Sequence, residues 1–412
     1  MTQTRTQSPT ASPPLEGLVV IDLTRYIAGP YCTMLMADAG ATVVKVEPMR
    51  GEDTRHLAPF IEDPSGEPVS AYFLRMNRNK RSIGLDLKSP EGLGALEKLL
   101  LHADVLVENF RPGVLARLGL SEEKLQALNP RLVYCSISGF GHSPSPLRER
   151  AAYNVVAEYE AGVYVKRATD GLPGPVGPPV GDMFPALHAL SGVMMALYRR
   201  NITGRGERVD IAMYDSMLSL NELRSSYARL YGQQWDPYEH PFYCPYGVYE
   251  VADGYLCIDV TTDRQWRNFC VATGRPELYD VEGLTTGPSR VAKYEELIRE
   301  PLEEWLGAHT RDDAVAIFSA HGVPTAAVRS PGEALESEQA RARAMDLEIR
   351  DVSGARVNTA GNPIKIGAWN DAVEAEAPGL AADTEWVLRE LAGMTEESVA
   401  ELFELKVARK GC

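Results

Sequence analysis

The sequence predicts an α/β protein with a large Rossmann-like domain, built on a mostly parallel sheet, and a smaller α+β domain. Short apolar runs alternate with helical segments up to Gly139, and this alternation is typical of a parallel sheet covered by helices on both faces. The alternation loosens after Gly139, and a stretch rich in Pro and Tyr at 233–249 marks a boundary or a functional loop. Two domains are therefore expected.

The first elements are expected to form a βαβ unit. Residues 18–22 and 42–47 are apolar enough for strands, and Gly29-Pro30 opens a helix that runs to about Asp38. Beyond this unit, strands are expected at 82–87, 104–108 and 132–136, with a helix from Ser89-Pro90 through about His102. This order predicts the Rossmann-like sheet.

The rest of the chain mixes helices with fewer strands. Helices are expected at 153–162, 184–200 and 214–231, with a strand at 208–211. A hairpin at 249–260, helices at 264–274, 292–309 and 311–321, and a strand at 323–329 form the small domain, and C-terminal helices at 383–392 and 395–408 pack on the large one. The expected organisation is a disordered tail over 1–14, a large domain over 15–232 completed by 331–412, and a small domain over 233–330.

Composition excludes several classes of protein. The chain has 412 residues, 44% of them hydrophobic, and a formal net charge of −15, which argues against a general nucleic-acid binder. The absence of a run of about 18 apolar residues predicts no membrane span. Residues 1–14 lack the apolar segment of a secretory signal, and the six cysteines are widely spaced without a C-x-x-C pair. We expect a cytoplasmic protein without a disulfide framework or a zinc site.

Common catalytic motifs are also missing. The first βα turn, Thr24–Pro30, lacks G-x-G-x-x-G, so it offers no ready cradle for a dinucleotide. The seven histidines show no H-x-x-H or H-E-x-x-H spacing, and no G-x-S-x-G elbow occurs. Nicotinamide, metal and serine-hydrolase chemistry are therefore disfavoured.

Asp182 is the most informative residue. A Pro/Gly-rich loop over 171–179 delivers it to the start of an apolar helical run, and Pro185 is expected in the first turn, where its missing N–H costs little. Free N–H groups at a helix N-terminus favour a charged carboxylate, which could act as a nucleophile. The alternative is that Asp182 only caps the helix, and local sequence alone favours the cap.

Two further patterns suggest an anion site. Four cations lie within the seven residues from Arg75 to Arg81, and Lys80 and Arg81 among them could hold phosphates; the alternative is a solvated loop. Asn109–Gly113 follows a predicted parallel strand, at the edge where open α/β sheets usually bind ligands.

The chain resembles the class III CoA-transferases, which include formyl-CoA transferase, carnitine CoA-transferase and the related α-methylacyl-CoA racemases. Seven segments carry this resemblance, in the same order along nearly the whole chain: Leu15–Asp22, Ala28-Gly29-Pro30, Gly40–Glu47, Asn79–Ser82, Val107–Gly113, Gly181-Asp182 and Thr203–Gly206.

The resemblance implies an intertwined, ring-like homodimer with a CoA-binding large domain. It implies that Asp182 attacks an acyl-CoA thioester, giving a mixed anhydride and then an aspartyl-CoA thioester that is passed to an acceptor carboxylic acid. No metal is implied. The implied CoA-contacting positions are Ile27, Ala28, Asn109, Phe110, Arg117, Leu118 and Arg150.

Departures from the family pattern refine this expectation. Ile27 replaces a glutamine of formyl-CoA transferase, and 233–249 lacks that enzyme's Gly-rich loop, so oxalate/formate exchange is not expected. The racemase histidine is missing from Arg150–Asn154, so transfer is favoured over racemisation, the alternative. A CoA-binding protein without activity is a third hypothesis. His188 is expected to be packed or partner-bonded, while Tyr243, Tyr246 and His240 are open candidates for an acyl pocket.

Overall fold

The computed structural model describes residues 12–166, 171–232, 242–367, 369 and 375–411. It divides into two compact units, the first comprising Met1–Glu222 with Glu338–Cys412 and the second Leu223–Ser337, as far as these are described. The second unit starts at Leu223 and ends at Ser337, whereas the sequence placed the small domain at 233–330. Helix α9 (Glu222–Tyr231), apart from its first residue, and helix α14 (Pro331–Leu335) account for the difference.

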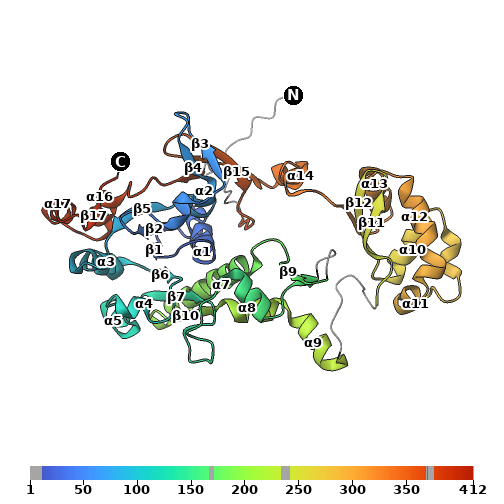
Figure 1. The fold of residues 1–412 in the computed structure, drawn as a ribbon, viewed down its shortest axis with the longest axis horizontal. Coiled ribbons are helices and arrows are strands. Elements are labelled where there is room, and N and C mark those ends of the chain that lie inside the picture. Colours follow the sequence, from blue (N-terminus) through green and yellow to red (C-terminus); the bar gives the residue numbers. More distant parts are fainter. Residues whose placement is uncertain (1–11, 167–170, 233–241, 368, 370–374, 412) are drawn as a thin grey trace. The chain divides into compact units, whose positions relative to one another are not determined.

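The first unit is built on a mostly parallel sheet (Figure 1). Its described strands, in spatial order, are β10 (Arg208–Ala212), β7 (Val133–Ser138), β6 (Val105–Glu108), β1 (Val19–Asp22), β2 (Thr42–Glu47), β5 (Arg81–Leu85) and β17 (Ala408–Arg409). All neighbours pair in parallel except β17, which runs antiparallel to β5. This confirms the predicted mostly parallel sheet. The chain end was expected to stay helical to 408 and instead adds an edge strand.

Helices cover both faces of this sheet, because strand side chains alternate between them. Val20 and Val105 belong to one buried cluster, and their neighbours Ile21 and Leu106 belong to the other. The first cluster includes residues of α1 (Ala28–Asp38), α6 (Asn154–Glu160), α7 (Val180–Thr203) and α8 (Met213–Leu220). The second includes residues of α3 (Pro90–His102), α4 (Val114–Arg117), α5 (Glu122–Leu128) and α17 (Glu396–Glu404).

Two helices differ from the sequence-based expectation. Helix α7 starts at Val180 and not near Phe184, one turn earlier than expected. The single helix expected over 214–231 is broken into α8 and α9 at Asn221, whose Nδ2 donates to the carbonyls of Ala161 and Gly162, both at 3.1 Å. Side-chain bonds of this kind compete with helix continuation.

A group of smaller elements completes the first unit. They are β3 (Phe60–Glu62), β4 (Pro68–Ser70), α2 (Ala71–Asn77), β8 (Val165–Lys166), β9 (Pro173–Gly174), α15 (Glu338–Ala342), β14 (Asp346–Asp351), β15 (Arg356–Ala360), β16 (Ala375–Ala377), α16 (Thr384–Trp386), a 3₁₀ turn (Asp53–His56) and a π turn (Val387–Leu391). The short helix and the π turn at 384–391 fall where the sequence predicted a helix, at 383–392, and the sequence did not predict the others. Phe73 and Leu74 of α2 pack against Ile349 of β14 in a small core of their own.

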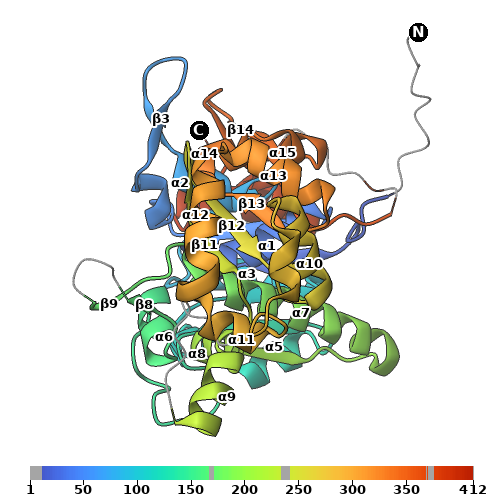
Figure 2. The ribbon, with the colours of Figure 1, turned by 90° about the vertical axis from the view of Figure 1, so that its right-hand side faces the viewer.

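The second unit is a small α+β structure (Figure 2). Its antiparallel strands are β11 (Tyr246–Val251), β12 (Gly254–Asp259) and β13 (Thr325–Ala327). Besides α9 and α14, its helices are α10 (Asp263–Ala272), a 3₁₀ turn (Pro276–Asp280), α11 (Gly287–Ala292), a π turn (Tyr294–Ile298), α12 (Arg299–Gly307) and α13 (Arg311–Ala320). The core contains the stacked rings of Trp266, Phe269 and Phe318.

Helix α7 is the one described helix that is long and apolar enough, by length and composition alone, to cross a membrane. The sequence predicted an apolar helix at 184–200 and no membrane span. Ala186, Ala189 and Val193 of α7 are buried in the core beside the central sheet. The face of α7 that carries these three residues therefore packs within the first unit.

Candidate active site

A cavity of about 550 Å³ lies in the first unit where the strand order reverses. Strands β2 and β5 follow β1 on one side, and β6, β7 and β10 lie on the other, which is the arrangement that opens a crevice at the carboxyl ends of the strands. The cavity is lined by the loop after β1, the loop after β6, the end of β7, the segment 150–154, Pro179 and Asp182. The sheet topology therefore explains where the cavity is.

Asn109 holds the two central loops together. Its Oδ1 accepts a hydrogen bond from the Arg25 main-chain N at 2.9 Å, and its Nδ2 donates to the Arg25 carbonyl at 2.8 Å. The Arg25 guanidinium lies 5.9 Å from the centre of the Phe110 ring, within cation–π range. Tyr26, next in the loop, has φ of 65°, a left-handed conformation that is uncommon for a residue with a side chain. One side chain thus fixes the loops of two strands against each other.

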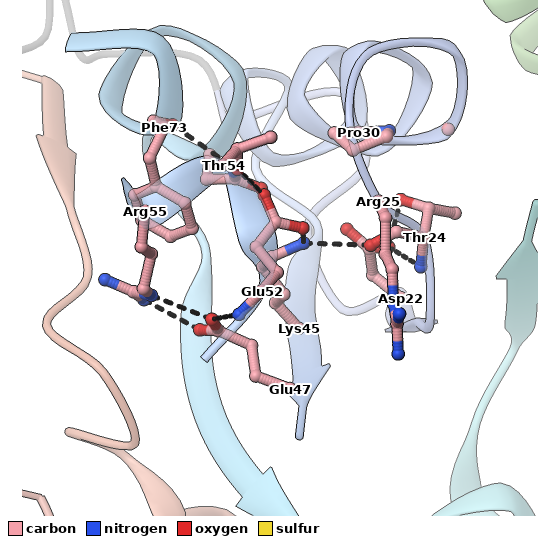
Figure 3. A network of polar contacts seen from close by, with 12 residues as sticks. Asp22, Thr24, Arg25, Pro30, Lys45, Glu47, Glu52, Thr54, Arg55 and Phe73 are labelled. Atoms are coloured by element: carbon pink, nitrogen blue, oxygen red, sulfur yellow. Dashed lines mark hydrogen bonds and ion pairs between the residues drawn. The ribbon is translucent and has the colours of Figure 1, made fainter. Parts of the chain in front are cut away.

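A buried ion-pair network supports the loop after β1 (Figure 3). Lys80 Nζ contacts Asp22 Oδ2 at 3.0 Å, and Lys45 Nζ donates to the Thr24 carbonyl at 3.0 Å and pairs with Glu52 at 2.8 Å. Burial alone would raise the pKa of Asp22, but Lys80 and Lys45, together with hydroxyl donors, hold it well below its usual value. Asp22 is therefore a charged, fully paired structural residue.

The network extends to helix α2. Arg55 donates to both oxygens of Glu47 at 2.7 Å, and its guanidinium lies 3.6 Å from the centre of the Phe73 ring (Figure 3). Phe73 follows Tyr72, whose side chain lines the cavity. Burial, and then the Asp182 carboxylate, raise the pKa of Tyr72 to about 12, so its hydroxyl is a neutral hydrogen-bond donor.

Asp182 is the third residue of α7 and lines the cavity. The capping alternative is wrong, because Pro179 is the N-cap residue and Asp182 is the third residue inside the helix. The expectation that the helix terminus favours the charged form is also corrected. Burial, followed by the nearby Glu158 carboxylate, raises the pKa of Asp182 to about 7. Desolvation and like charge outweigh the helix terminus here.

Pro185 lies deeper in α7 than expected. It is the sixth helical residue and not part of the first turn. Proline has no N–H, so the Gly181 carbonyl lacks the donor that a helix normally supplies four residues later. The first turn is held instead by the Pro179 carbonyl, which accepts from the N–H groups of Asp182 and Met183, both at 3.0 Å.

The structure brings most of the candidate site residues together. The cavity is lined by Ile27, Ala28, Asn109, Phe110, Arg150 and Asp182. Arg117 and Leu118 are not among its lining residues; they lie at the end of α4, whose first residue, Val114, does line it. The Arg150 side chain is half exposed and pairs with Glu160 at 2.7 Å.

The basic run has a different role from either expectation. Arg78 and Lys80 are buried, and Arg78 pairs with Asp38 at 2.8 Å. Arg81 pairs with Asp383 at 2.9 Å, and its guanidinium lies 3.9 Å from the centre of a Trp386 ring. Lys80 and Arg81 do not line the cavity, so this is neither a solvated loop nor, in this unit, a phosphate site beside Asp182.

Other candidates are placed as follows. His188 Nδ1 lies 2.9 Å from Ser216 Oγ, so this histidine is partner-bonded, as expected. Tyr243 and Tyr246 belong to the second unit, with ring centres 6.3 Å apart. His240 lies outside the described residues.

Sequence reasoning missed the side chains of Tyr26, Tyr72 and Met213 in the cavity and of Glu158 behind Asp182. Tyr26 and Tyr72 carry no spacing signal. Glu158 carries only a weak one, because it follows the apolar run Val155–Ala157 in an expected helix that also contains Glu160.

Residues 15–384 match the family model described as CoA-transferase family III. The chain belongs to this family. The predicted enzyme class is thereby confirmed: the protein is a CoA-transferase, which uses CoA thioesters as co-substrates.

Relatives of this family III CoA-transferase cover nearly its whole length. A succinyl-CoA:mesaconate CoA-transferase from Haloarcula hispanica is 37% identical over 360 residues, 85% of this chain and 90% of the relative. A succinate–glutarate CoA-transferase from Agrobacterium fabrum is 34% identical over 394 residues, 94% of this chain and 98% of the relative. The crystal structure of a CaiB/BaiF family protein from Brucella suis matches with a TM-score of 0.80 and 33% identity, covering 92% of this chain and 100% of that one.

Proposed function

We propose that the protein moves CoA between organic acids through covalent adducts of Asp182. A carboxylate oxygen of Asp182 attacks the thioester carbonyl carbon, the C–S bond breaks, and CoA leaves as a thiolate. The thiolate then attacks the Asp182 carbonyl of the mixed anhydride, releases the first acid as a carboxylate, and forms an aspartyl-CoA thioester. An acceptor carboxylate enters and the same steps run in reverse, so the thioester energy is kept.

The position of Asp182 carries this proposal. It is the acid that lines the cavity at the sheet's reversal point, among the described residues, and burial followed by Glu158 raises its pKa to about 7. A carboxylate of this basicity is a stronger nucleophile than an ordinary aspartate and is still ionised in part at neutral pH. Arg25 and Arg150 line the same cavity and can attract an anionic substrate.

We assign CoA to the loops that meet at this cavity. Ile27 and Ala28 lie after β1, Phe110 lies after β6, and Arg150 precedes α6, so a single extended ligand can touch all four. Asn109 acts mainly by holding these loops in place. Arg117 and Leu118, at the end of α4, are assigned to the part of CoA that extends beyond the cavity.

Short dicarboxylic acids are the proposed donors and acceptors. Two relatives at 34–37% identity are named for succinyl-CoA, mesaconate, succinate or glutarate. In this chain the cavity is lined by Arg25, Arg111 and Arg148, besides Arg150. A second carboxylate on the acid would find a cationic partner there.

We also propose a homodimer in the cytoplasm. Exposed apolar side chains follow one face of α7, namely Leu187 at 38%, Met195 at 71%, Tyr198 at 72% and Ile202 at 72% exposure. A face of this kind is typical of a surface covered by a partner. The buried free thiols of Cys32 and Cys135 suit a reducing compartment. Light scattering coupled to gel filtration tests the dimer.

Replacement of Asp182 tests the mechanism. With succinyl-CoA and a dicarboxylate acceptor, Asp182→Asn should lower the rate of exchange on the order of 10⁴-fold or more while CoA still binds. Hydroxylamine trapping followed by peptide mass spectrometry should label Asp182 in the wild type only. Asp215→Asn, on α8 and outside the cavity lining, is the matched control and should keep exchange. Undiminished exchange by Asp182→Asn contradicts the proposal, and α-deuterium exchange without any acceptor acid would favour an isomerase.

A further inference from the structure

Glu158 is a buried carboxylate next to the start of the helix that carries Asp182. It is 1% exposed, and its Oε1 accepts a hydrogen bond from the Gly181 main-chain N at 2.9 Å. Gly181 is the second residue of α7, so this N–H is one of the helix-terminal donors that have no partner within the helix. Glu158 supplies that partner from α6 and lies beside Asp182 as a result.

The glycine explains how Glu158 reaches this position. A Cβ on Gly181 would lie 2.4 Å from the Asn154 carbonyl oxygen, so only glycine lets the start of α6 approach so closely. Glu158 comes four residues after Asn154 in α6 and therefore lies on the same face of that helix. The contact at Gly181 and the placement of Glu158 are two parts of one helix–helix contact.

Glu158 and Asp182 thus lie close together in a poorly solvated part of the protein. A like charge disfavours the ionised form of a buried carboxylate, and Glu158 is the charged neighbour that, after burial, raises the pKa of Asp182. Any covalent adduct of Asp182, anhydride or thioester, is neutral at that position. The repulsion therefore exists in the free carboxylate and is absent from the adducts.

Other ionisable groups surround the cavity. Its remaining ionisable lining residues are Arg25, Tyr26, Tyr72, Arg111, Arg148, Arg150 and Tyr153. From the other elements packed near α7, Asp210 of β10 and Asp215 of α8 interact with each other, and Tyr31 of α1 interacts with Arg78 and Asp38. The pKa of Asp182 responds to burial and to Glu158, so Glu158 is the group to change.

We propose that Glu158 is a positioning residue that destabilises the free Asp182 carboxylate and thereby favours its conversion into the covalent adducts. This inference rests on the proposed role of Asp182 as nucleophile. When the Asp182 oxygen bonds to the acyl carbon and the C–S bond breaks, the negative charge leaves with the CoA thiolate and moves away from Glu158. Part of the cost of forming a reactive anhydride is thus offset by the relief of repulsion.

Glu158→Gln separates charge from shape, because glutamine keeps a carbonyl oxygen for the Gly181 N–H. The acid limb of the rate–pH profile should move to lower pH by roughly one unit. Intact-protein mass spectrometry at fixed concentrations of acyl-CoA and CoA measures the fraction of enzyme present as the Asp182 adduct. The equilibrium constant for adduct formation derived from this fraction should be about tenfold lower in the variant, because one pKa unit represents a factor of ten. The rate above pH 8 should fall about threefold if reactivity follows basicity as it does for thiolates.

Controls keep this test decisive. Glu91→Gln, on the exposed first turn of α3, removes the same charge elsewhere and should leave profile and adduct unchanged. A purely structural role for Glu158 would lower the amount of folded enzyme without moving the profile. An unshifted profile with an unchanged adduct fraction in folded Glu158→Gln overturns the inference. Should that variant not fold, Glu158→Asp decides, because it draws the carboxylate back by one methylene: the acid limb should again move to lower pH, and an unmoved limb overturns the inference.

The two proposals fail in different ways. If Asp182→Asn still exchanges CoA, Asp182 is not the nucleophile and the proposed function fails. If Asp182→Asn is inactive but Glu158→Gln behaves like the wild type, the nucleophile stands and only the role of Glu158 is lost.

Discussion

Asp22 is fully buried and Asp182 is partly buried, both near the carboxyl edge of the sheet, yet their surroundings act on their pKa values in opposite directions. Asp22, at the end of β1, contacts Lys80 and accepts from Thr24, and its pKa lies well below the usual range. Asp182, at the start of α7, has Glu158 as its charged neighbour, and its pKa is raised to about 7. Burial raises the pKa of both; the neighbours decide the outcome.

The difference separates a residue that stabilises the fold from one suited to reaction. A buried charge with a good partner is strongly held and chemically quiet, whereas one beside a like charge is costly to maintain. Strongly raised pKa values are typical of functional sites for this reason. Four predictions test the contrast, in order of decreasing effect.

Asp22→Asn should destabilise the first unit by about 3–5 kcal/mol, because the Lys80 ammonium stays buried without its counter-ion. Hydrogen exchange of β1 and β2 peptides during urea titration measures this effect in the first unit alone. Wild-type stability should also fall in acid. The ionised Asp22 stabilises the folded state above the unfolded-state pKa of about 4, and this stabilisation is lost as the pH falls from there towards the lowered pKa of the folded state. Unchanged exchange protection in Asp22→Asn would refute the assigned role of this pair.

Gly181→Ala should destabilise α7 and its contact with α6 by about 1–3 kcal/mol, because the added Cβ would lie 2.4 Å from the Asn154 carbonyl oxygen. The same change displaces Glu158 from the Gly181 N–H, so exchange of CoA should slow as well. Thermal unfolding and steady-state rates measure both. Gly94→Ala in α3 has open space around the new Cβ and is the matched control, expected to be neutral or slightly stabilising.

Asp182→Asn should stabilise the folded protein, whereas Asp22→Asn should destabilise it. In the folded state the raised pKa of Asp182 means that more protons are bound than in the unfolded chain between about pH 4 and pH 7, so wild-type stability falls as pH rises through this window. Asparagine removes the buried charge and should stabilise the protein above pH 7 by about 1–2 kcal/mol, with no gain near pH 4. Equal urea midpoints for the two proteins at pH 8 would count against a raised pKa.

Lys124→Ala should have the smallest effect of the four on the free energy of unfolding. The Lys124–Glu97 pair joins α5 and α3 with side chains 44% and 27% exposed, and an ion pair this exposed contributes below about 1 kcal/mol. Urea unfolding of this variant should therefore differ little from the wild type. A loss comparable to that of Asp22→Asn would show that exposure does not govern the strength of ion pairs in this protein.

Sequence patterns predicted the parallel sheet well, because strands buried on both faces leave continuous apolar runs such as Val105–Val107. The resemblance to the CoA-transferases, and not a local pattern, implied that Asp182, Asn109 and Arg150 share a site, and all three line one cavity. Sequence patterns could not predict the fate of Lys80, because a basic run looks alike whether it faces solvent or a buried acid 58 residues away in the chain. The surroundings of Asp182 depend on an α6–α7 contact that no local pattern reveals.

Pro185 has a mechanical consequence for the reaction. Without an N–H for the Gly181 carbonyl, the turn that carries Asp182 is joined to the remainder of α7 by fewer hydrogen bonds than an ordinary helical turn. The turn is attached instead to its neighbours, through the hydrogen bond from Gly181 to Glu158 and the bonds to the Pro179 carbonyl. The direction in which the Asp182 carboxyl group faces its substrate is therefore set by α6 and the preceding loop more than by the long helix behind it.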